Sequence, residues 1–187
     1  HLHPIHTEAV QSYAELASVL GPGVDVILCE TVASLAHAEA VLAGAKHAGK
    51  PVWIAFTLDD TDGQRLRSGE PLWALRPVIE RHAPEAVLIN CSRPEAITAG
   101  LEIIKAFCLP FGGYANGFTR VSAEFLKNAP TVDALDRRKD LGPAEYADHA
   151  MGWVEQGATI VGGCCEVGPA HISELTRRLG GAGYEVA

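Results

Sequence analysis

The sequence predicts an α/β protein of the (β/α)8 TIM barrel class, with only about the last five βα units present in this chain. Two observations favour this class. Continuous apolar, β-branched runs alternate with helix-like runs, which is typical of a parallel sheet covered by helices. Polar and unusual residues follow the carboxyl ends of those runs, where a barrel builds its active site. An open doubly wound sheet is the alternative, but "CETVAS" (29–34), after the first run, is not a Gly-rich phosphate turn.

The strands are predicted from short apolar runs bounded by turn residues. "VDVILCE", "PVWIAFTL", "EAVLINC" and "ATIVGG" are continuous and rich in β-branched side chains, whereas "PFGGYAN" is a weaker case because it contains two glycines. The expected strands are, in order, 24–30, 51–58, 85–91, 110–116 and 158–163.

The helices are predicted from alanine-rich or amphipathic segments with suitable ends. Gly49 terminates the second helix, Pro94 lies in the first turn of the fourth, and the last begins near Pro169 with Ile172, Leu175 and Leu179 facing the core. The expected helices are, in order, 7–20, 34–49, 71–82, 93–107, 143–156 and one beginning at about 169.

Length sets the expected domain organisation. A whole barrel usually takes about 250 residues, whereas this sequence has 187. We therefore expect residues 1–187 to form a single partial barrel domain that lacks the first three βα units. The segment between Asn116 and Pro143 is longer than a simple connection and is expected to pass over the barrel mouth.

Composition excludes several classes of function. The net charge of −8 and the absence of a basic cluster argue against nucleic-acid or anionic-membrane partners. No apolar run approaches the roughly 20 residues that span a bilayer. The odd number of cysteines, five, does not resemble a secreted disulfide framework. A cytoplasmic protein with reduced thiols is the resulting expectation.

The stretch "TIVGGCCEVGP" (159–169) places two thiols side by side at the end of an expected strand. Neighbouring strand residues point to opposite faces, but Gly162 and Gly163 are expected to relax that constraint. Cys164 and Cys165 would then turn toward one ion together with Cys91, since thiolates are ligands of Zn²⁺. A vicinal disulfide and simple packing remain alternatives, because Cys91 is distant in sequence.

Several motifs together resemble the homocysteine S-methyltransferase family of zinc-dependent enzymes. These are "DVILCET" (25–31), "PVWIAFTLDDTDGQRLRSGEPL" (51–72), "INCS" (89–92), "YANG" (114–117) and "GGCCEVGPAHI" (162–172). The similarity extends from about Val24 to Leu179. It implies a (β/α)8 barrel in which Cys91, Cys164 and Cys165 bind Zn²⁺.

The resemblance also implies the reaction, a methyl transfer to the thiol of homocysteine that gives methionine. Glu30 is expected to help bind the amino-acid part of homocysteine, and Asn90 and Asn116 either orient the substrate or satisfy backbone groups. The partners are homocysteine and a small-molecule methyl donor, and a homo-oligomer is allowed. S-Methylmethionine, S-adenosylmethionine, betaine and a folate or corrinoid route are all compatible. Because the early barrel motifs are absent from these residues, inactivity of this chain alone is one expectation.

Two other functions compete. Cys164 and Cys165 would serve as a redox-active thiol pair in an otherwise non-catalytic barrel. The histidines of "HLHPIH", which are His1, His3 and His6, would suggest a metal-dependent hydrolase, although no strand precedes them. Among the remaining polar residues, Asp59 and Asp60 are expected in a solvated turn, and His171 in the first turn of the last helix.

Overall fold

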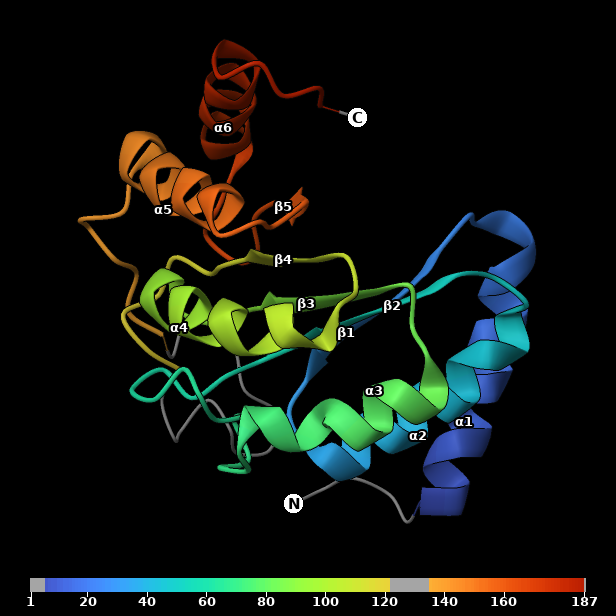
Figure 1. Ribbon diagram of the computed structural model, residues 1–187. Coiled ribbons are helices and arrows are strands. Elements are labelled where there is room, and N and C mark those ends of the chain that lie inside the picture. Colours follow the sequence, from blue (N-terminus) through green and yellow to red (C-terminus); the bar gives the residue numbers. More distant parts are fainter. Residues whose placement is uncertain (1–5, 122–134, 187) are drawn as a thin grey trace.

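The computed structural model describes residues 6–121 and 135–186 and contains one parallel sheet. Its strands follow one another in chain order, β1-β2-β3-β4-β5, and each is hydrogen-bonded in parallel to the next (Figure 1). The strands are β1 (Ile27–Val32), β2 (Val52–Phe56), β3 (Ala86–Asn90), β4 (Phe111–Tyr114) and β5 (Ile160–Val161).

Of the described helices, the first precedes β1, the last follows β5, and the others lie between successive strands. The helices are α1 (His6–Leu20), α2 (Leu35–Ala45), α3 (Arg76–His82), α4 (Pro94–Ile104), α5 (Pro143–Glu155) and α6 (Pro169–Gly181). Short 3-10 turns adjoin four of them, at Gly21–Gly23, Lys46–Ala48, Leu72–Leu75 and Lys105–Phe107. Within the described residues, no helix has the length and apolar character needed to cross a membrane.

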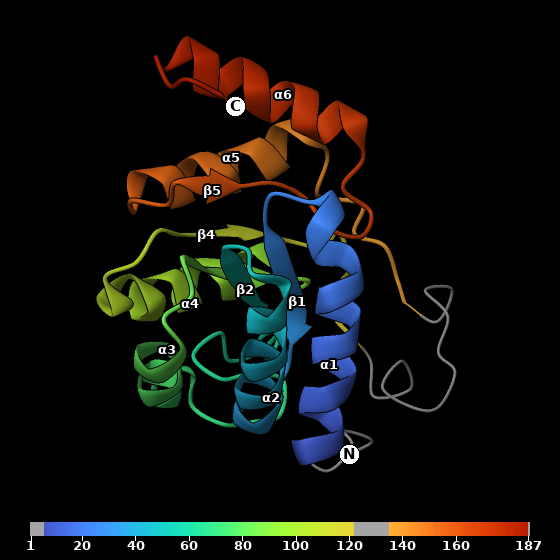
Figure 2. The same cartoon turned by 90° about the vertical axis from the view of Figure 1, so that its right-hand side faces the viewer.

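The strand order supports the barrel class over a doubly wound sheet. A doubly wound sheet reverses its strand order at a switch point, whereas this order never reverses. The crossover helices pack against the strands that they join: α2 contacts β1 and β2, α4 contacts β3 and β4, and α5 contacts β4 and β5. The sheet is strongly twisted, so that β1 and β5 run in very different directions in Figure 2.

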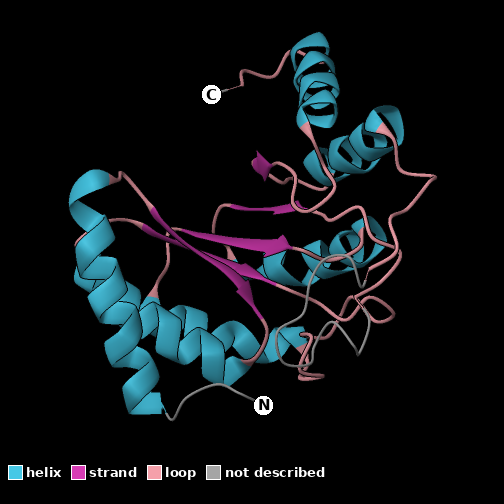
Figure 3. Ribbon diagram, turned by 180° about the vertical axis from the view of Figure 1, so that it is seen from behind, coloured by secondary structure: helices cyan, strands magenta, loops and turns pink. Residues whose placement is uncertain are grey.

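The two faces of the sheet carry different side chains because neighbouring strand residues alternate between faces. The helix-covered face holds the main core, including Ile54, Phe56, Val87 and Ile89. The opposite face carries a small cluster of Ala55, Leu88 and Tyr114, packed against Trp53, Ile160 and Cys164. This second face, which no helix covers in Figure 3, is where a barrel has its interior.

The predicted elements are confirmed, with shorter strands than expected. In the last helix Leu175 and Leu179 face the core as expected, but the expectation for Ile172 is wrong, because this side chain is 39% exposed. The last strand contracts from 158–163 to Ile160–Val161, although backbone hydrogen bonds from Thr159 and Gly162 to β4 continue its pairing. Strand β4 forms despite its two glycines, and Gly112 is required there because a side chain at this position would collide with the Ile160 carbonyl. Glycine is therefore part of the β4–β5 contact, which explains why propensity alone understated this strand.

Two expectations fall outside the described residues. His1 and His3 of the hydrolase alternative precede residue 6, and residues 122–134, which make up half of the segment expected to pass over the barrel mouth, are not described. These expectations remain predictions.

Candidate metal centre

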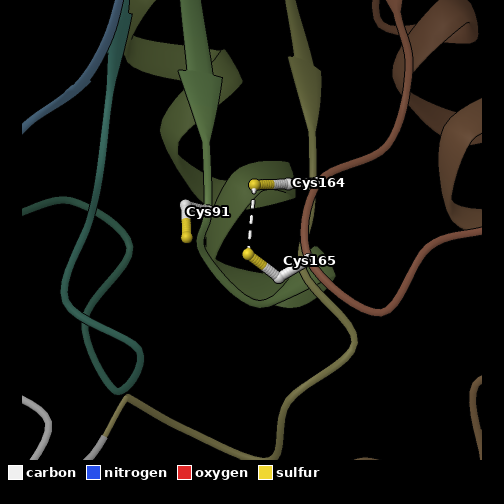
Figure 4. A group of neighbouring side chains, drawn as sticks. All are labelled: Cys91, Cys164 and Cys165. Carbon is white, nitrogen blue, oxygen red and sulfur yellow. Dashed lines mark hydrogen bonds between the residues drawn. The ribbon is translucent and has the colours of Figure 1, made fainter. Parts of the chain in front are cut away.

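Three cysteine thiols meet at the carboxyl ends of the strands. Cys91 directly follows β3, whereas Cys164 and Cys165 follow β5, and their sulfur atoms all lie within 4.8 Å of one another. Figure 4 shows the Cys164 and Cys165 side chains reaching from one loop toward Cys91. The fold therefore brings together residues that are distant in sequence, as the parallel arrangement predicts.

The adjacent thiols converge for a different reason from the one expected. Neither Gly162 nor Gly163 has a positive φ; the left-handed residue of this turn is Glu166, with φ 65°. The chain leaves the sheet after β5, and a bond from the Val167 N–H to the Cys164 carbonyl (3.1 Å) closes a turn. Gly163 is needed for space, since a side chain there would collide with Val167.

Hydrogen bonds fix the turn that carries Cys164 and Cys165 against β4. The Cys164 N–H donates to the Ala115 carbonyl (2.9 Å), and the Gly117 N–H donates to the Cys165 carbonyl (2.8 Å). The buried Tyr146 hydroxyl of α5 accepts from the Ala115 N–H (3.0 Å) and donates to the Gly162 carbonyl (2.6 Å). Helix α5 thus braces the loop from behind.

Cys91 is held in an unusual backbone conformation. Its φ is 46°, a left-handed value that costs a non-glycine residue roughly 1–2 kcal/mol. Such strain persists where the surroundings enforce it, and it clusters at functional sites. The Cys91 N–H donates to the Tyr114 carbonyl (3.2 Å), and the Asn116 amide lies 3.9 Å from the Cys91 sulfur. Asn116 therefore lies beside the Cys91 thiol, and its amide oxygen accepts from the Phe118 N–H (3.1 Å).

The three thiols fit a tetrahedral metal site with one open position. Three ligands at about 2.3 Å around Zn²⁺ would place the sulfurs about 3.8 Å apart. The Cys164 and Cys165 sulfurs are 3.8 Å apart, and the widest separation in the group, at most 4.8 Å, needs only a small closure. All five cysteines of the chain are free thiols, so the donors are available to an ion.

The pKa values of the three thiols are shifted in different directions. The pKa of Cys91 is lowered to about 6, mainly by a hydrogen bond from Cys164 and further by Asn116, Cys165 and the charge of Arg67. The pKa values of Cys164 and Cys165 are raised, the first chiefly through its bond to Cys91 and the second by burial. The lowered pKa of Cys91 favours its thiolate form, which is the form that binds a cation.

Glu30 and Asn90 lie nearby but play different parts. The Tyr114 hydroxyl donates to the Glu30 carboxylate (2.8 Å) from the face of the sheet that carries Cys164. Asn90 is buried, and both polar atoms of its side-chain amide are hydrogen-bonded to Thr31. The amide oxygen accepts from the Thr31 N–H (3.0 Å), and the amide nitrogen donates to the Thr31 hydroxyl (2.9 Å). Asn90 thus holds Thr31 at φ 58°, directly after Glu30.

Asp59 and Asp60 were both expected in a solvated turn, and this expectation is wrong for Asp60. Asp59 makes the expected exposed turn, in which hydrogen bonds from Thr61 lower the pKa of its carboxyl group. Asp60 is instead buried in an ion pair with Arg67, because its carboxylate also accepts backbone N–H groups. His171 lies in the first turn of α6, as expected.

Sequence reasoning missed three residues that shape the site: Arg67, Tyr114 and Tyr146. Arg67 stands in the polar loop after β2, and Tyr114 stands in the "YANG" motif. Their positions beside recognisable motifs were the available signal. Tyr146 has no such signal, since only packing brings its helix to the loop.

Comparison of the sequence with known proteins gives one consistent result. The family model described as homocysteine S-methyltransferase matches residues 1–179. A homocysteine S-methyltransferase of Escherichia coli is 29% identical over 91% of this chain and 54% of its own length. A maize homocysteine S-methyltransferase 4 is 28% identical over 91% and 48%, and a selenocysteine Se-methyltransferase of Brassica oleracea is 28% identical over 95% and 48%. The chain thus spans about half the length of the curated relatives it matches.

Solved structures give the same result. The metallated form of the E. coli homocysteine methyltransferase MmuM superimposes with a TM-score of 0.67 at 25% identity, covering 90% of this chain and 52% of that one. The apo form gives a TM-score of 0.65, covering 90% and 57%. Both the fold and the sequence therefore point to one family.

Proposed function

Because this chain belongs to the homocysteine S-methyltransferase family, we propose that it carries the metal and thiol-acceptor site of a zinc-dependent methyl transfer to homocysteine, giving methionine. The observation that carries the proposal is the convergence of three thiols from two strand ends within 4.8 Å. Residues 1–187 form one partial barrel domain in this proposal. The proposed location is cytoplasmic, where thiols stay reduced.

The three cysteines hold the ion in this proposal. Cys91, Cys164 and Cys165 supply three thiolates and leave a fourth position open for the substrate sulfur. A zinc ion held by these residues would act as a Lewis acid that favours the thiolate form of the substrate sulfur. The residues of the chain fix the direction from which that sulfur meets the methyl group, which is chiefly a positioning effect.

Other side chains orient the rest of the substrate. Glu30 is the proposed acceptor for the ammonium group of homocysteine, and the Tyr114 hydroxyl keeps its carboxylate in place. Asn116 lies next to the Cys91 sulfur and is a candidate donor to the substrate. Asn90 acts indirectly by holding Thr31 beside Glu30.

The methyl donor is a small molecule whose leaving group departs in line with the attacking sulfur. The acidic chain favours a cationic donor, either a sulfonium such as S-methylmethionine or S-adenosylmethionine, or an ammonium such as betaine. A donor panel tests this: methionine formation from homocysteine with one of these compounds supports the proposal. Labelled methyl groups identify the donor directly.

Metal analysis tests the site without requiring turnover. We expect about one zinc per chain in the purified reduced protein and its loss in Cys91→Ala, since removing one of three thiolates destroys the site. Cys108→Ala is the matched control, because Cys108 is an exposed free thiol outside the cluster. Zinc-free wild-type protein that also fails to take up added zinc contradicts the proposal.

The same measurement addresses the redox alternative. A two-thiol redox pair needs only Cys164 and Cys165, whereas Cys91 also lies within ligand distance. A redox pair predicts that Cys91→Ala leaves the reduction potential of the other two thiols intact and that no zinc binds. Zinc binding that depends on all three cysteines favours methyl transfer.

A further inference from the structure

The loop after β2 contains a buried ion pair, Asp60–Arg67, directly behind the Cys91 turn. Asp60 and Arg67 side chains are only 6% and 11% exposed. The contact is bidentate: Arg67 Nη1 donates to Asp60 Oδ2 (3.0 Å), and Nη2 donates to Oδ1 (3.2 Å). Such a fork fixes both partners in one geometry.

Arg67 also reaches the carbonyl oxygen of Cys91. Its Nη2 lies 3.4 Å from that oxygen, and its Nε and Nη2 donate to the Thr57 hydroxyl (3.2 and 3.3 Å). The Thr57 hydroxyl lies 3.3 Å from the same carbonyl and donates to it. The guanidinium and the hydroxyl therefore hold one peptide group together.

Asp60 holds the other side of the same turn. Its Oδ1 accepts from the Arg93 N–H (3.3 Å), and its Oδ2 accepts from the Val121 N–H (2.7 Å). Between Cys91 and Arg93, the Ser92 hydroxyl accepts a hydrogen bond from the Leu58 N–H (2.8 Å). The loop after β2 is thus bonded to each of the three consecutive residues 91, 92 and 93.

The strained residue lies at the centre of these contacts. Cys91 is left-handed, with φ 46°, and released from its bonds it would relax to negative φ. Because φ determines where Cβ points, this relaxation would move the Cys91 sulfur away from Cys164 and Cys165. The bonded loop opposes that movement.

Stability alone does not account for the pair. Burying two charges costs desolvation energy that their attraction often only offsets, so a buried ion pair is weak evidence for stability. The same loop also has an exposed pair, Arg65–Asp62, with side chains 52% and 48% exposed. The two pairs differ in what they touch, since the contacts of Arg65 lie within its own loop, to Asp62 and the Gly69 carbonyl.

We propose that Asp60 and Arg67 are positioning residues that hold the Cys91 turn in its left-handed conformation, so that the three thiols are arranged for a metal before it binds. This inference rests on the proposed function only in taking the thiols as metal ligands. Beyond the proposed function, it assigns to Asp60 and Arg67 an effect on the affinity of the three thiols for the metal. Residues behind a ligand typically change metal affinity by about 10- to 100-fold when they are replaced.

The test compares zinc affinity, measured by competition with a chelating dye, between wild type and variants of the reduced chain. Arg67→Met and Asp60→Asn are each expected to bind zinc at least about tenfold more weakly. Arg67→Lys keeps the charge but loses the fork, so it is expected to restore only part of the affinity. Arg65→Met, from the exposed pair, is the matched control and is expected to bind like wild type.

Cobalt(II) in place of zinc gives a second readout that a merely structural role would not change. The intensity of the sulfur-to-cobalt charge-transfer band follows the number of bound thiolates, so a displaced Cys91 removes about one third of it. Far-UV circular dichroism identifies variants that have lost their fold. If Arg67→Met is unfolded, folded Asp60→Asn carries the test with the same expectation.

The outcomes separate the two proposals. A wild-type chain that binds neither ion contradicts the proposed metal site itself. A wild-type chain that binds zinc, with folded Arg67→Met or Asp60→Asn binding it within about twofold and showing an unchanged cobalt band, overturns the positioning role alone. Equal weakening by the control Arg65→Met also overturns it, because the effect would then belong to the loop as a whole.

Discussion

Cys91 combines a left-handed backbone with the lowered pKa of its thiol, and both features arise from its neighbours. The backbone strain is opposed by bonds from another loop. The pKa is lowered because Cys164, Asn116 and Cys165 are placed to donate to the sulfur. A cysteine at the end of an isolated strand would have neither feature.

The pKa difference predicts which thiol reacts first in the metal-free reduced protein. The pKa of Cys91 is about 6 in the folded chain, against an ordinary value of 9.0. The Cys91 thiolate therefore contributes to the free energy of unfolding at high pH, and this contribution is lost as the pH falls through about 6. We expect iodoacetamide to label Cys91 with a midpoint near pH 6, and Cys165, whose pKa is raised, only at higher pH. Peptide mass mapping measures both. A Cys91 midpoint between pH 8 and 9 would contradict the lowered pKa of Cys91.

Tyr114 offers a test of how Glu30 is oriented. Burial and the Glu30 carboxylate raise the pKa of Tyr114, so its hydroxyl stays protonated and donates at 2.8 Å. Tyr114→Phe is expected to weaken homocysteine binding about tenfold, the loss of one hydrogen bond to a charged group, and to leave zinc affinity unchanged. Calorimetry on zinc-loaded protein measures this.

The double variant Glu30→Gln/Tyr114→Phe supplies the control for that experiment. If Tyr114 acts through Glu30, the losses in homocysteine affinity are less than additive. Fully additive losses would separate the two residues and contradict the assigned role.

At the scale of elements, the site depends on how β4, β5 and α5 meet. Gly112 allows β5 to approach β4, and Tyr146 of α5 joins the two strand ends through the Ala115 N–H and the Gly162 carbonyl. The strands position the cysteines, and the helix fixes the loops that follow them. The edge of the sheet that carries the three thiols is thus set by contacts among three elements and not by either loop alone.

Tyr146→Phe tests this bracing. Removal of the hydroxyl leaves a buried N–H and a carbonyl without their partner, which should lower the free energy of unfolding by about 1–3 kcal/mol. Urea denaturation measures the change. Tyr184→Phe, at an exposed position, is the control and is expected to change stability by less than about 0.5 kcal/mol. Equal effects of the two substitutions would show that the Tyr146 hydroxyl does not brace the loop.

At the scale of the whole molecule, apolar side chains are exposed near both edges of the sheet. Within the described residues, β1 and β5 each pair with one strand only. Beside β1, a cavity of about 200 Å³ is lined by Leu16, Leu20 and Leu28. Among the described residues, the exposed large apolar side chains near β1 are Leu16, Val19, Leu20 and Leu28, and those near the carboxyl end are Ile172, Tyr184 and Val186. Trp73, in the turn before α3, is also exposed.

Open edges and exposed apolar surface predict self-association. We expect sedimentation velocity to show species larger than one chain that grow with concentration. Val19→Lys, at a position 77% exposed on α1, should shift the distribution toward single chains without loss of helical circular dichroism. A wild-type chain that stays monomeric at all concentrations would contradict this expectation.

The sequence by itself determined the α/β class, the order of the elements and the three cysteines. Apolar runs separated by helical segments specify parallel strands, and parallel strands bring their carboxyl ends to one edge, so Cys91 and the Cys164–Cys165 pair were expected to meet. The motifs that carry the family resemblance stand in the same loops. Periodicity and local turn signals act over few residues, which is why they can be read directly.

Only the tertiary structure decided how the site is held. Asp60 was expected in water, yet it is buried against Arg67, because backbone N–H groups from residues 93 and 121 converge on it. The turn of Cys164 and Cys165 was assigned to flexible glycines, whereas Gly163 is required there by close packing and the left-handed residue of the turn is Glu166. These features depend on contacts between segments distant in sequence, and such contacts leave no local pattern.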